Sequence, residues 1–317
     1  MDFPGAISLA VPLTLARSLC LDADLAYEPA QRRLRLTTPN GAGEVAFLDF
    51  GPQDRAPDLV FVHANGFNAR AYRTILSPLA GTLRIVAFDQ RGHGATTLPT
   101  DHARTSWLDL KDDLIAFLDA MAIGRVALAG HSMGATASLL TAAEAPGRVR
   151  ALALLDPVIR PPDAEAAGSP EAIGASPMVA GAARRRRGFP SHTAAIESYR
   201  GRGAFRTWTE AQLADYVTAG FKPSADGGVE LACTPEWEVS NYVNQAHDAW
   251  AAFDASRCPI WILQAAIDSP GRLREGAGRL AATGRIRLDT VAETTHFLPM
   301  ERPDLVREAI GWAVEQP

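Results

Sequence analysis

Short apolar segments alternate with helix-like segments along most of this chain. Eight segments have the length and apolar content of β-strands: residues 33–37, 44–50, 59–63, 84–88, 126–129, 151–155, 260–264 and 286–291. The middle ones are apolar on both faces, as in buried parallel strands. Residues 106–121 have their apolar side chains at helical spacing. This order predicts an α/β fold, a mostly parallel eight-stranded sheet with helices on both faces.

The alternation stops after residue 158, and strand-like segments resume only near residue 259. The intervening part is rich in Pro, Gly and Ala at first and then contains short helix-like segments such as residues 209–220. A long helical segment inserted between two strands of one sheet is more typical of a lid than of a linker. We therefore predict a core formed by residues 1–158 and 246–317, and a helical cap formed by residues 159–245.

Charge and cysteine content restrict the class of protein. The net charge is −5, from 31 Lys and Arg against 36 Asp and Glu, which argues against a protein that binds nucleic acid. Cys20, Cys233 and Cys258 are far apart and indicate neither a disulfide framework nor a zinc site. The apolar residues 6–15 are too few to span a bilayer and follow an acidic start, which disfavours a signal peptide. We expect a cytoplasmic protein without a membrane anchor.

The sequence G-H-S-M-G at residues 130–134 is the motif with the clearest chemistry. It follows the strand-like residues 126–129 and precedes the helix-forming residues 135–145. In this context a serine sits on a tight turn between strand and helix, and the flanking glycines leave room for neighbouring backbone. The motif predicts Ser132 as a nucleophile.

The sequence H-A-N-G-F at residues 63–67 ends an earlier apolar strand. A turn of small residues at this place can bring a backbone N–H group toward the serine. Acyl transfer needs two such donors for the developing oxyanion, and one normally comes from the residue after the nucleophile. We predict the N–H groups of Met133 and Phe67 as these donors. An ordinary strand-to-helix loop, in which His63 bonds backbone groups, is the alternative.

His296 is the predicted general base. It follows the last strand and precedes a helix that starts near Pro303. A histidine on such a loop can reach the serine and take its proton, and a surface histidine is the alternative interpretation. The sequence D-Q-R-G-H-G at residues 89–94 indicates a buried ion pair that braces a turn. Neither His93 nor His131 is predicted to be the base.

Together with T-H-F-L-P-M-E at residues 295–301, these motifs resemble the α/β-hydrolase superfamily, in its capped branch of esterase-like and C–C-bond-hydrolase-like members. The resemblance covers most of the chain outside residues 158–246. It implies a sheet of about eight strands, a helical cap after the sixth strand, and a Ser, acid, His triad in that chain order. It also implies no cofactor.

Two aspartates are candidates for the acid. Asp268 ends the strand-like residues 259–266 and matches the family's usual position after the seventh strand. Asp156 ends the preceding strand, where some capped members have their acid. We favour Asp268 and keep Asp156 as the alternative.

These features predict a serine hydrolase that cleaves a carboxylic ester, lactone or thioester through an acyl-enzyme. Two alternatives stay open: hydrolysis of a C–C bond next to a ketone, and a ligand receptor with little turnover. Trp208, Trp237 and Tyr242, in the predicted cap, favour a small to medium apolar or aromatic substrate. No metal site is predicted. We expect a small acyl substrate as the only partner, neither nucleic acid nor membrane, and a monomer or homodimer.

Overall fold

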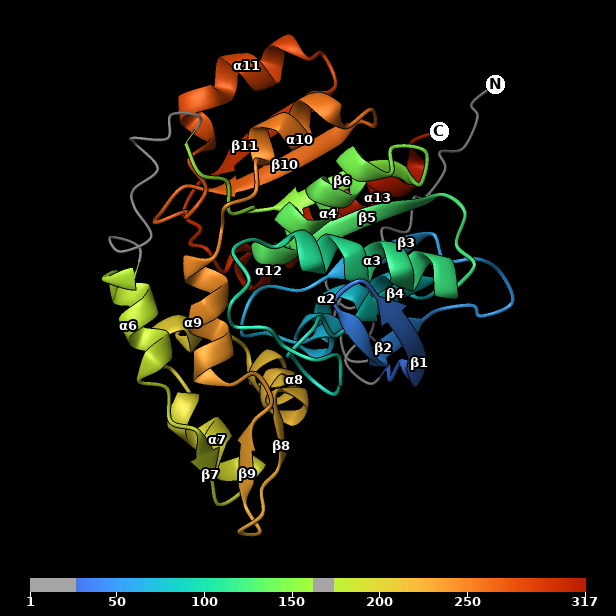
Figure 1. Ribbon diagram of the computed structural model, residues 1–317. Helices are drawn as coiled ribbons and strands as arrows, with labels where there is room; N and C mark the ends of the chain where they lie inside the picture. The colour runs from blue at the N-terminus through green and yellow to red at the C-terminus, as the bar shows by residue number, and fades with distance from the viewer. Residues whose placement is uncertain (1–26, 162–173) are drawn as a thin grey trace, which may run out of the picture.

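The structure is a computed structural model, and it describes residues 27–161 and 174–317. Residues 6–15, Cys20 and residues 162–173 of the predicted cap lie outside the described residues. Figure 1 shows a central twisted sheet with helices on both sides, and a group of short helices and strands at one end.

Eight strands form the main sheet in the order β1-β2-β4-β3-β5-β6-β10-β11. β1 and β4 both run antiparallel to β2, and every other neighbouring pair in this sheet is parallel. The predicted α/β fold is therefore confirmed, with all eight predicted segments in one sheet. The strands are β1 (Ala30–Thr38), β2 (Gly41–Phe50), β3 (Leu59–Val62), β4 (Ile85–Phe88), β5 (Val126–His131), β6 (Val149–Leu155), β10 (Ile260–Ala265) and β11 (Ile286–Val291).

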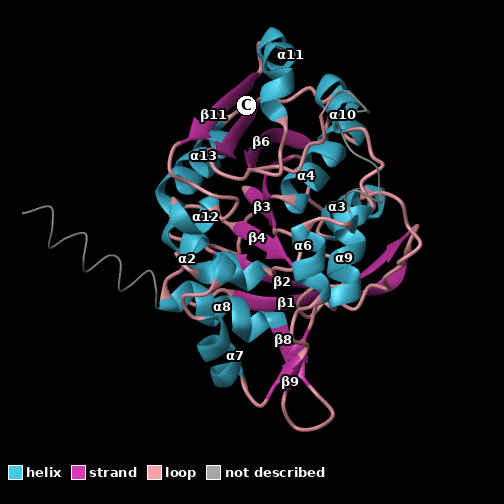
Figure 2. Cartoon of the chain, turned by 90° about the vertical axis from the view of Figure 1, so that its left-hand side faces the viewer, coloured by secondary structure: helices cyan, strands magenta, loops and turns pink. Residues whose placement is uncertain are grey.

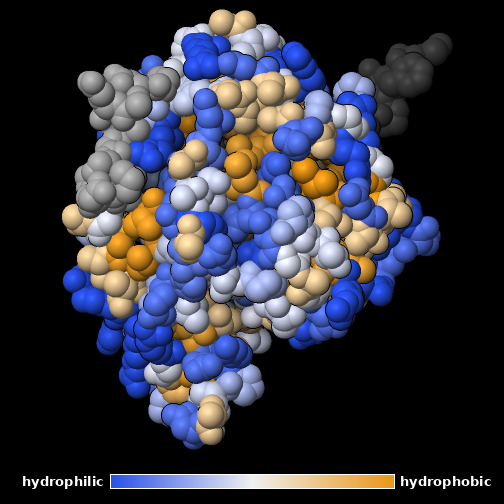
Figure 3. Space-filling view, viewed as in Figure 1, coloured by the Kyte–Doolittle hydropathy of each residue, from blue (hydrophilic) through white to orange (hydrophobic). Residues whose placement is uncertain are grey.

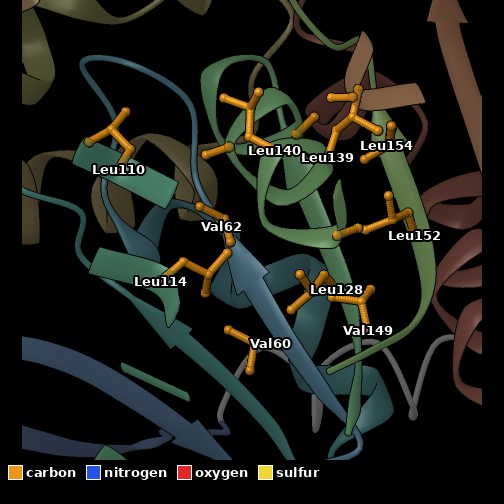
Figure 4. Close-up of a cluster of buried hydrophobic side chains, with 14 of the residues drawn as sticks. Val60, Val62, Leu110, Leu114, Leu128, Leu139, Leu140, Val149, Leu152 and Leu154 are labelled. Atoms are coloured by element: carbon orange, nitrogen blue, oxygen red, sulfur yellow. The ribbon is translucent and has the colours of Figure 1, made fainter. Parts of the chain in front are cut away.

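Two helical layers cover the sheet. One layer contains α3 (Leu108–Ala120), α4 (Met133–Glu144) and α10 (Ala249–Ala255); the other contains α2 (Arg73–Leu76), α12 (Leu298–Glu301) and α13 (Pro303–Glu315), and α11 (Ala277–Ala282) packs beside β11. Successive side chains of a strand point to opposite faces, so Val60 and Val62 face Leu114 of α3 (Figure 4), whereas Phe61 packs into the opposite core. Within the described ranges, no helix is long and apolar enough to cross a membrane.

Residues 174–245 form a group of short elements next to the carboxyl ends of the central strands. Figure 1 places this group at one end of the molecule, and Figure 2 looks at the molecule from the side on which the group lies. α8 (Glu210–Gly220) packs on the short helical turn Ala69–Tyr72, and α9 (Pro235–Val243) packs on α6 (Pro177–Ala183). The extent of the cap, residues 159–245, stays a prediction. The elements are α6 (Pro177–Ala183), β7 (Gly188–Phe189), α7 (His192–Tyr199), α8 (Glu210–Gly220), β8 (Phe221–Pro223), β9 (Val229–Leu231) and α9 (Pro235–Val243), with the three strands in the order β7-β9-β8.

Candidate active site

Ser132 lies on a strained turn between β5 and α4. Its backbone has φ 56° and ψ −120°, a conformation that is costly for a residue with a side chain. The flanking glycines are required by space: a Cβ on Gly134 would lie 2.3 Å from the Val62 carbonyl oxygen, and one on Gly130 would lie 2.5 Å from the Gly134 carbonyl oxygen. The turn therefore presses the start of α4 against the end of β3.

His296 joins the Ser132 hydroxyl to a carboxylate. Its Nε2 lies 2.9 Å from Ser132 Oγ, and its Nδ1 lies 2.6 Å from Asp156 Oδ2. β6 pairs with β5 in the register His131 to Leu155, so the residue after each strand, Ser132 and Asp156, meets at the same edge of the sheet. With a proton on Nδ1 bonded to Asp156, the histidine has Nε2 free to accept the serine proton.

The Asp156 carboxylate is fully buried and has three hydrogen-bonding partners that favour its charged form. Oδ1 accepts hydrogen bonds from the Ala265 N–H at 2.9 Å and from the Ser269 hydroxyl at 2.6 Å, while Oδ2 faces the His296 ring. Burial alone would raise the pKa of Asp156, but the hydrogen bonds and charge of its partners outweigh burial and hold this pKa below its ordinary value. Asp156 therefore stays ionised beside His296.

Asp268, the favoured acid, does not contact the His296 ring nitrogen in this way, so that prediction is wrong. It lies three residues beyond the end of β10, has φ 50° and is exposed. The two residues after Ala265 continue beside β11 and the loop after it, because their N–H groups donate to the Val291 and Thr294 carbonyl oxygens. Asp268 instead lines an open cleft beside His296.

In the 64–67 turn after β3, the backbone N–H group that lacks an acceptor is not the predicted one. The Phe67 N–H donates to the Ala64 carbonyl oxygen at 3.1 Å, so the prediction of a free Phe67 donor is wrong. The same oxygen lies 2.7 Å from His63 Nδ1. A trans peptide directs its N–H opposite to its C=O, so the Asn65 N–H points away from these two donors. Among residues 27–161 and 174–317 it has no acceptor.

The Met133 N–H is the second donor at this place. Met133 is the first residue of α4, and the first N–H groups of a helix have no intrahelical acceptor. Because Gly134 packs against the backbone of Val62 and His63, the start of α4 and the start of the 64–67 turn are neighbours. Met133 stays the predicted first donor, and Asn65 replaces Phe67 as the candidate for the second.

Three buried histidines hold the loops around the site in their neutral form. His63 Nε2 accepts the Gln90 N–H at 2.9 Å, and His93 Nε2 accepts the Gly66 N–H at 3.0 Å. Burial lowers the pKa of His63 to about 4, that of His131 to about 3, and that of His93 well below its ordinary value. Each ring can therefore accept one hydrogen bond and donate one at neutral pH.

His131 links the loop of the general base to the 64–67 turn. Its Nε2 lies 2.8 Å from the His296 carbonyl oxygen, and its Nδ1 lies 2.7 Å from the Tyr72 hydroxyl. That hydroxyl accepts the Ala64 N–H at 3.2 Å. Since a carbonyl only accepts, His131 Nε2 donates to it, Nδ1 accepts from Tyr72, and the chain of donors and acceptors is complete.

We expect His131 to make folding stability depend on pH. The unfolded chain gains a proton on this histidine below about pH 6.5, whereas the folded protein gains it only near pH 3. Stability from the neutral ring is therefore fully present above pH 6.5 and is lost as the pH falls toward 3, by up to about 1.4 kcal/mol per pH unit. Urea titrations between pH 7.5 and 4.5 measure the slope.

The matched comparison is His131→Gln, which retains a donor for the His296 carbonyl oxygen but does not titrate. Its unfolding free energy should fall less steeply with acid than that of the wild type. The comparison is needed because Asp89, whose pKa burial raises to about 6, contributes with the opposite sign over part of this range. Equal slopes for the two proteins would contradict the expectation.

The three aromatic residues predicted to bind substrate lie in different surroundings. Trp237 is almost completely buried, and its indole N–H donates to the Arg91 carbonyl oxygen at 2.9 Å. It packs over Gly92, so its predicted place in the substrate pocket is wrong. Trp208 is half-buried and lies against Phe67, with ring centroids 5.5 Å apart. Tyr242 is half-buried, and burial followed by the nearby negative charge of Glu238 raises its pKa.

A cleft of about 740 Å³ opens beside His296. The surface of the cleft is mostly apolar, with Pro177, Met178 and Phe297 in its lining, and the charged Arg206, Asp268 and Glu301 line it as well. Figure 3 shows apolar surface around α6. Met178, a residue of α6 that lines the cleft, is 46% exposed. A larger cleft of about 850 Å³ lies between the β1 and β2 strands and Lys222, away from the Ser132 hydroxyl.

Metal ligation finds no support in the part of the chain that the structure describes: there, no group of three or more His, Cys, Asp or Glu side chains could hold an ion. Sequence reasoning missed the role of Asn65 and the hydrogen bonds by which His93 and His131 hold backbone groups. The alternative interpretation of His63, as a residue that bonds backbone groups, agrees with its hydrogen bond from the Gln90 N–H. The motif at residues 63–67 located the turn, but only the hydrogen bonds identify which N–H group in it is free.

Comparison with known proteins identifies the family to which this chain belongs. A family model described as the alpha/beta hydrolase family matches residues 59–309. The 2-(acetamidomethylene)succinate hydrolase of Mesorhizobium japonicum is 29% identical over 109 residues, 34% of this chain and 38% of that protein. The 2-hydroxy-6-oxo-2,4-heptadienoate hydrolase of Pseudomonas putida is 35% identical over 105 residues, 32% of this chain and 37% of that protein. The alignments thus span less than two-fifths of either relative.

A solved structure extends the similarity over nearly the whole chain. The crystal structure of E-2-(acetamidomethylene)succinate hydrolase superposes with a TM-score of 0.74, covering 90% of this chain and 100% of that one. The two sequences are 20% identical. This likeness concerns the fold alone, because fold is shared by many unrelated chemistries.

Proposed function

Because this chain belongs to the α/β hydrolase family, we propose that it is a serine hydrolase that cleaves a carboxylic ester, lactone or thioester through an acyl-enzyme. One observation supports this above all: His296 lies 2.9 Å from Ser132 Oγ and 2.6 Å from the Asp156 carboxylate. A serine, a histidine and a buried carboxylate joined in this order form an activated nucleophile.

In the proposed reaction, His296 Nε2 takes the Ser132 proton as Oγ attacks the carbonyl carbon. The carbonyl π electrons move to the oxygen, which accepts hydrogen bonds from the N–H groups of Met133 and Asn65. The tetrahedral intermediate then expels the leaving group, which takes its proton from His296. Water hydrolyses the acyl-enzyme with His296 again as base, while Asp156 stabilises the imidazolium and stays ionised.

We assign substrate choice to a cap formed by residues 159–245 over a core of residues 1–158 and 246–317. The position of Trp208 against Phe67, on the motif next to Ser132, supports this role. Together with the apolar cleft beside His296, it favours a small to medium apolar or aromatic acyl group. Tyr242 is the second residue of the cap that we propose to contact substrate.

Hydrolysis of a C–C bond next to a ketone is the second candidate. It is supported by the name of the Pseudomonas putida relative, a 2-hydroxy-6-oxo-2,4-heptadienoate hydrolase. The same serine, histidine and acid can serve this reaction, so a substrate panel must separate the two. A ligand receptor on the same scaffold is the third candidate, and the complete hydrogen-bonded triad argues against it.

The test begins with a fluorophosphonate probe, which bonds covalently to an activated serine. We expect wild-type protein to be labelled on the peptide that contains Ser132, and heat-denatured protein to stay unlabelled. Turnover of p-nitrophenyl acetate and butyrate is then compared with turnover of a conjugated 2-hydroxy-6-oxo-dienoate. Faster cleavage of the dienoate would replace the ester proposal by the C–C proposal, and absence of labelling would favour the receptor.

We also propose that the enzyme acts in the cytoplasm on a small molecule, without a cofactor, as a monomer or homodimer. Cys233 and Cys258 support a reducing compartment because both are buried free thiols. The net charge of −5 does not favour nucleic acid as a partner.

A further inference from the structure

We propose that Tyr216 on α8 and Asn241 on α9 are positioning residues for catalysis: they hold the 64–67 turn, so that the Asn65 N–H is correctly placed only while these two helices are seated on it. The inference rests on the proposed function and goes beyond it, because it makes the helices above the core part of the oxyanion site as well as a cover for the substrate.

Tyr216 holds the turn through the Gly66 carbonyl. Its hydroxyl oxygen lies 3.0 Å from the Gly66 carbonyl oxygen and 2.7 Å from Arg185 Nη2. A guanidinium only donates and a carbonyl only accepts, so Tyr216 accepts from Arg185 and must donate its own proton to Gly66. The direction of this hydrogen bond is therefore determined by its two partners.

Arg185 is itself fixed by a carboxylate of the same region. Its Nη1 lies 2.5 Å from Glu238 Oε2, and the exposed fractions of the two side chains are 17% and 9%. Glu238 also approaches the turn closely: a Cβ on Gly66, which has φ 73°, would lie 2.9 Å from Glu238 Oε1. Only glycine fits here without strain or displacement of Glu238.

The side-chain amide of Asn65 makes a hydrogen bond through its nitrogen and another through its oxygen. Its Nδ2 donates to the Glu238 carbonyl oxygen at 2.9 Å, and its Oδ1 accepts from Asn241 Nδ2 at 2.8 Å. Asn241 Oδ1 in turn accepts a hydrogen bond from Arg104. Asn241 is fully buried and Asn65 nearly so, so the amide orientation is set without competition from water.

These bonds act on the Asn65 side chain and on the Gly66 carbonyl, that is, on the residue that carries the candidate donor and on the next one. The core holds the same turn through His93, which accepts the Gly66 N–H at 3.0 Å. The turn is thus clamped between the core on one side and α8 and α9 on the other. Preorganised donors are worth most when they cannot relax away from the developing charge, so loosening either helix should weaken oxyanion stabilisation.

Tyr216→Phe is the sharpest test, because it removes one hydroxyl and retains the ring that packs on Phe67 at 5.4 Å. We expect kcat for the p-nitrophenyl ester to fall about tenfold to hundredfold, with KM changed less than about threefold. The inhibition constant of a boronic acid, which forms a tetrahedral adduct on serine, should rise in parallel with the loss of kcat. The matched control is Tyr199→Phe, whose ring lies in the same aromatic cluster and whose hydroxyl interacts with Arg185 but makes no hydrogen bond to the turn.

Asn241→Asp is the second variant. It retains an acceptor for Arg104 but removes the donor to Asn65, so kcat should fall while the melting temperature stays within a few degrees of wild type.

Wild-type kcat and boronic-acid affinity in Tyr216→Phe would overturn the inference and leave the serine-hydrolase proposal intact. An equal effect of Tyr199→Phe would also overturn it, since loss of a hydroxyl without a bond to the turn would then suffice to explain the loss. A wild-type protein without labelling or turnover would overturn both.

Discussion

Ser132→Ala is expected to lower kcat for the p-nitrophenyl ester by about three to six orders of magnitude. The hydroxyl is the only group of this side chain that His296 can activate, and loss of one triad member removes most of the effect of the whole triad. The unfolding free energy should change by less than about 1 kcal/mol, because the hydroxyl adds little packing on this turn. Steady-state kinetics and a urea titration measure the two quantities.

Ser138→Ala is the matched control for this experiment. Ser138 lies on the same helix, α4, and its hydroxyl donates to the Gly134 carbonyl oxygen at 2.8 Å without contact to His296. It should keep kcat within about twofold while losing about 1 kcal/mol of stability. If Ser132→Ala retains more than a few per cent of the wild-type kcat, the nucleophile assignment fails.

Asp156→Asn is expected to lower kcat by about four orders of magnitude, whereas Asp268→Asn should change it less than about threefold. An amide in place of the Asp156 carboxylate no longer favours the proton on His296 Nδ1 and no longer stabilises the imidazolium. The exposed Asp268 carboxylate is outside this chain of hydrogen bonds. Kinetics of both variants on one ester, with thermal melts, make the comparison.

Stability must be measured together with rate, because Asp156 also accepts hydrogen bonds from the Ala265 N–H and the Ser269 hydroxyl. An asparagine oxygen can retain these two, so the fold should persist at a cost of about 1–3 kcal/mol. A severe loss of kcat in Asp268→Asn, with near-normal turnover in Asp156→Asn, would return the acid role to Asp268.

The local pattern of apolar residues and glycines was sufficient to predict the strands and the turn that carries Ser132. All eight predicted segments are strands of one sheet, and Ser132 follows β5 and precedes α4. The reason is that strand burial and a strand-to-helix turn are set by residues adjacent in sequence: apolar runs for buried parallel strands, and glycines where backbone must approach backbone. His296 was located in the same way, as a histidine on the loop after the last strand.

The candidate acid depends on a contact between distant segments, and the candidate second oxyanion donor depends on which N–H groups already have an acceptor. Asp156 and Asp268 both follow sheet strands, and only the pairing of β6 with β5 in the register His131 to Leu155 places Asp156 opposite Ser132. The Phe67 N–H is ruled out by a local bond to the Ala64 carbonyl oxygen, three residues away, which the sequence H-A-N-G-F does not reveal. The turn itself is held from farther along the chain, because His93 accepts the Gly66 N–H. A list of residue types does not show which donors are already used.

By itself, the sequence determined the α/β sheet, the elbow at Ser132 and the loop that carries His296, because each follows from apolar periodicity or steric need within a few adjacent residues. The tertiary structure alone decided that Asp156 faces His296, that Trp237 is buried over Gly92, and that the Asn65 N–H is free. Those outcomes depend on strand register and on which hydrogen-bonding groups are already satisfied. The Ala64–Phe67 bond is local, but the hydrogen bonds that hold its turn and the acid in place join segments more than 20 residues apart.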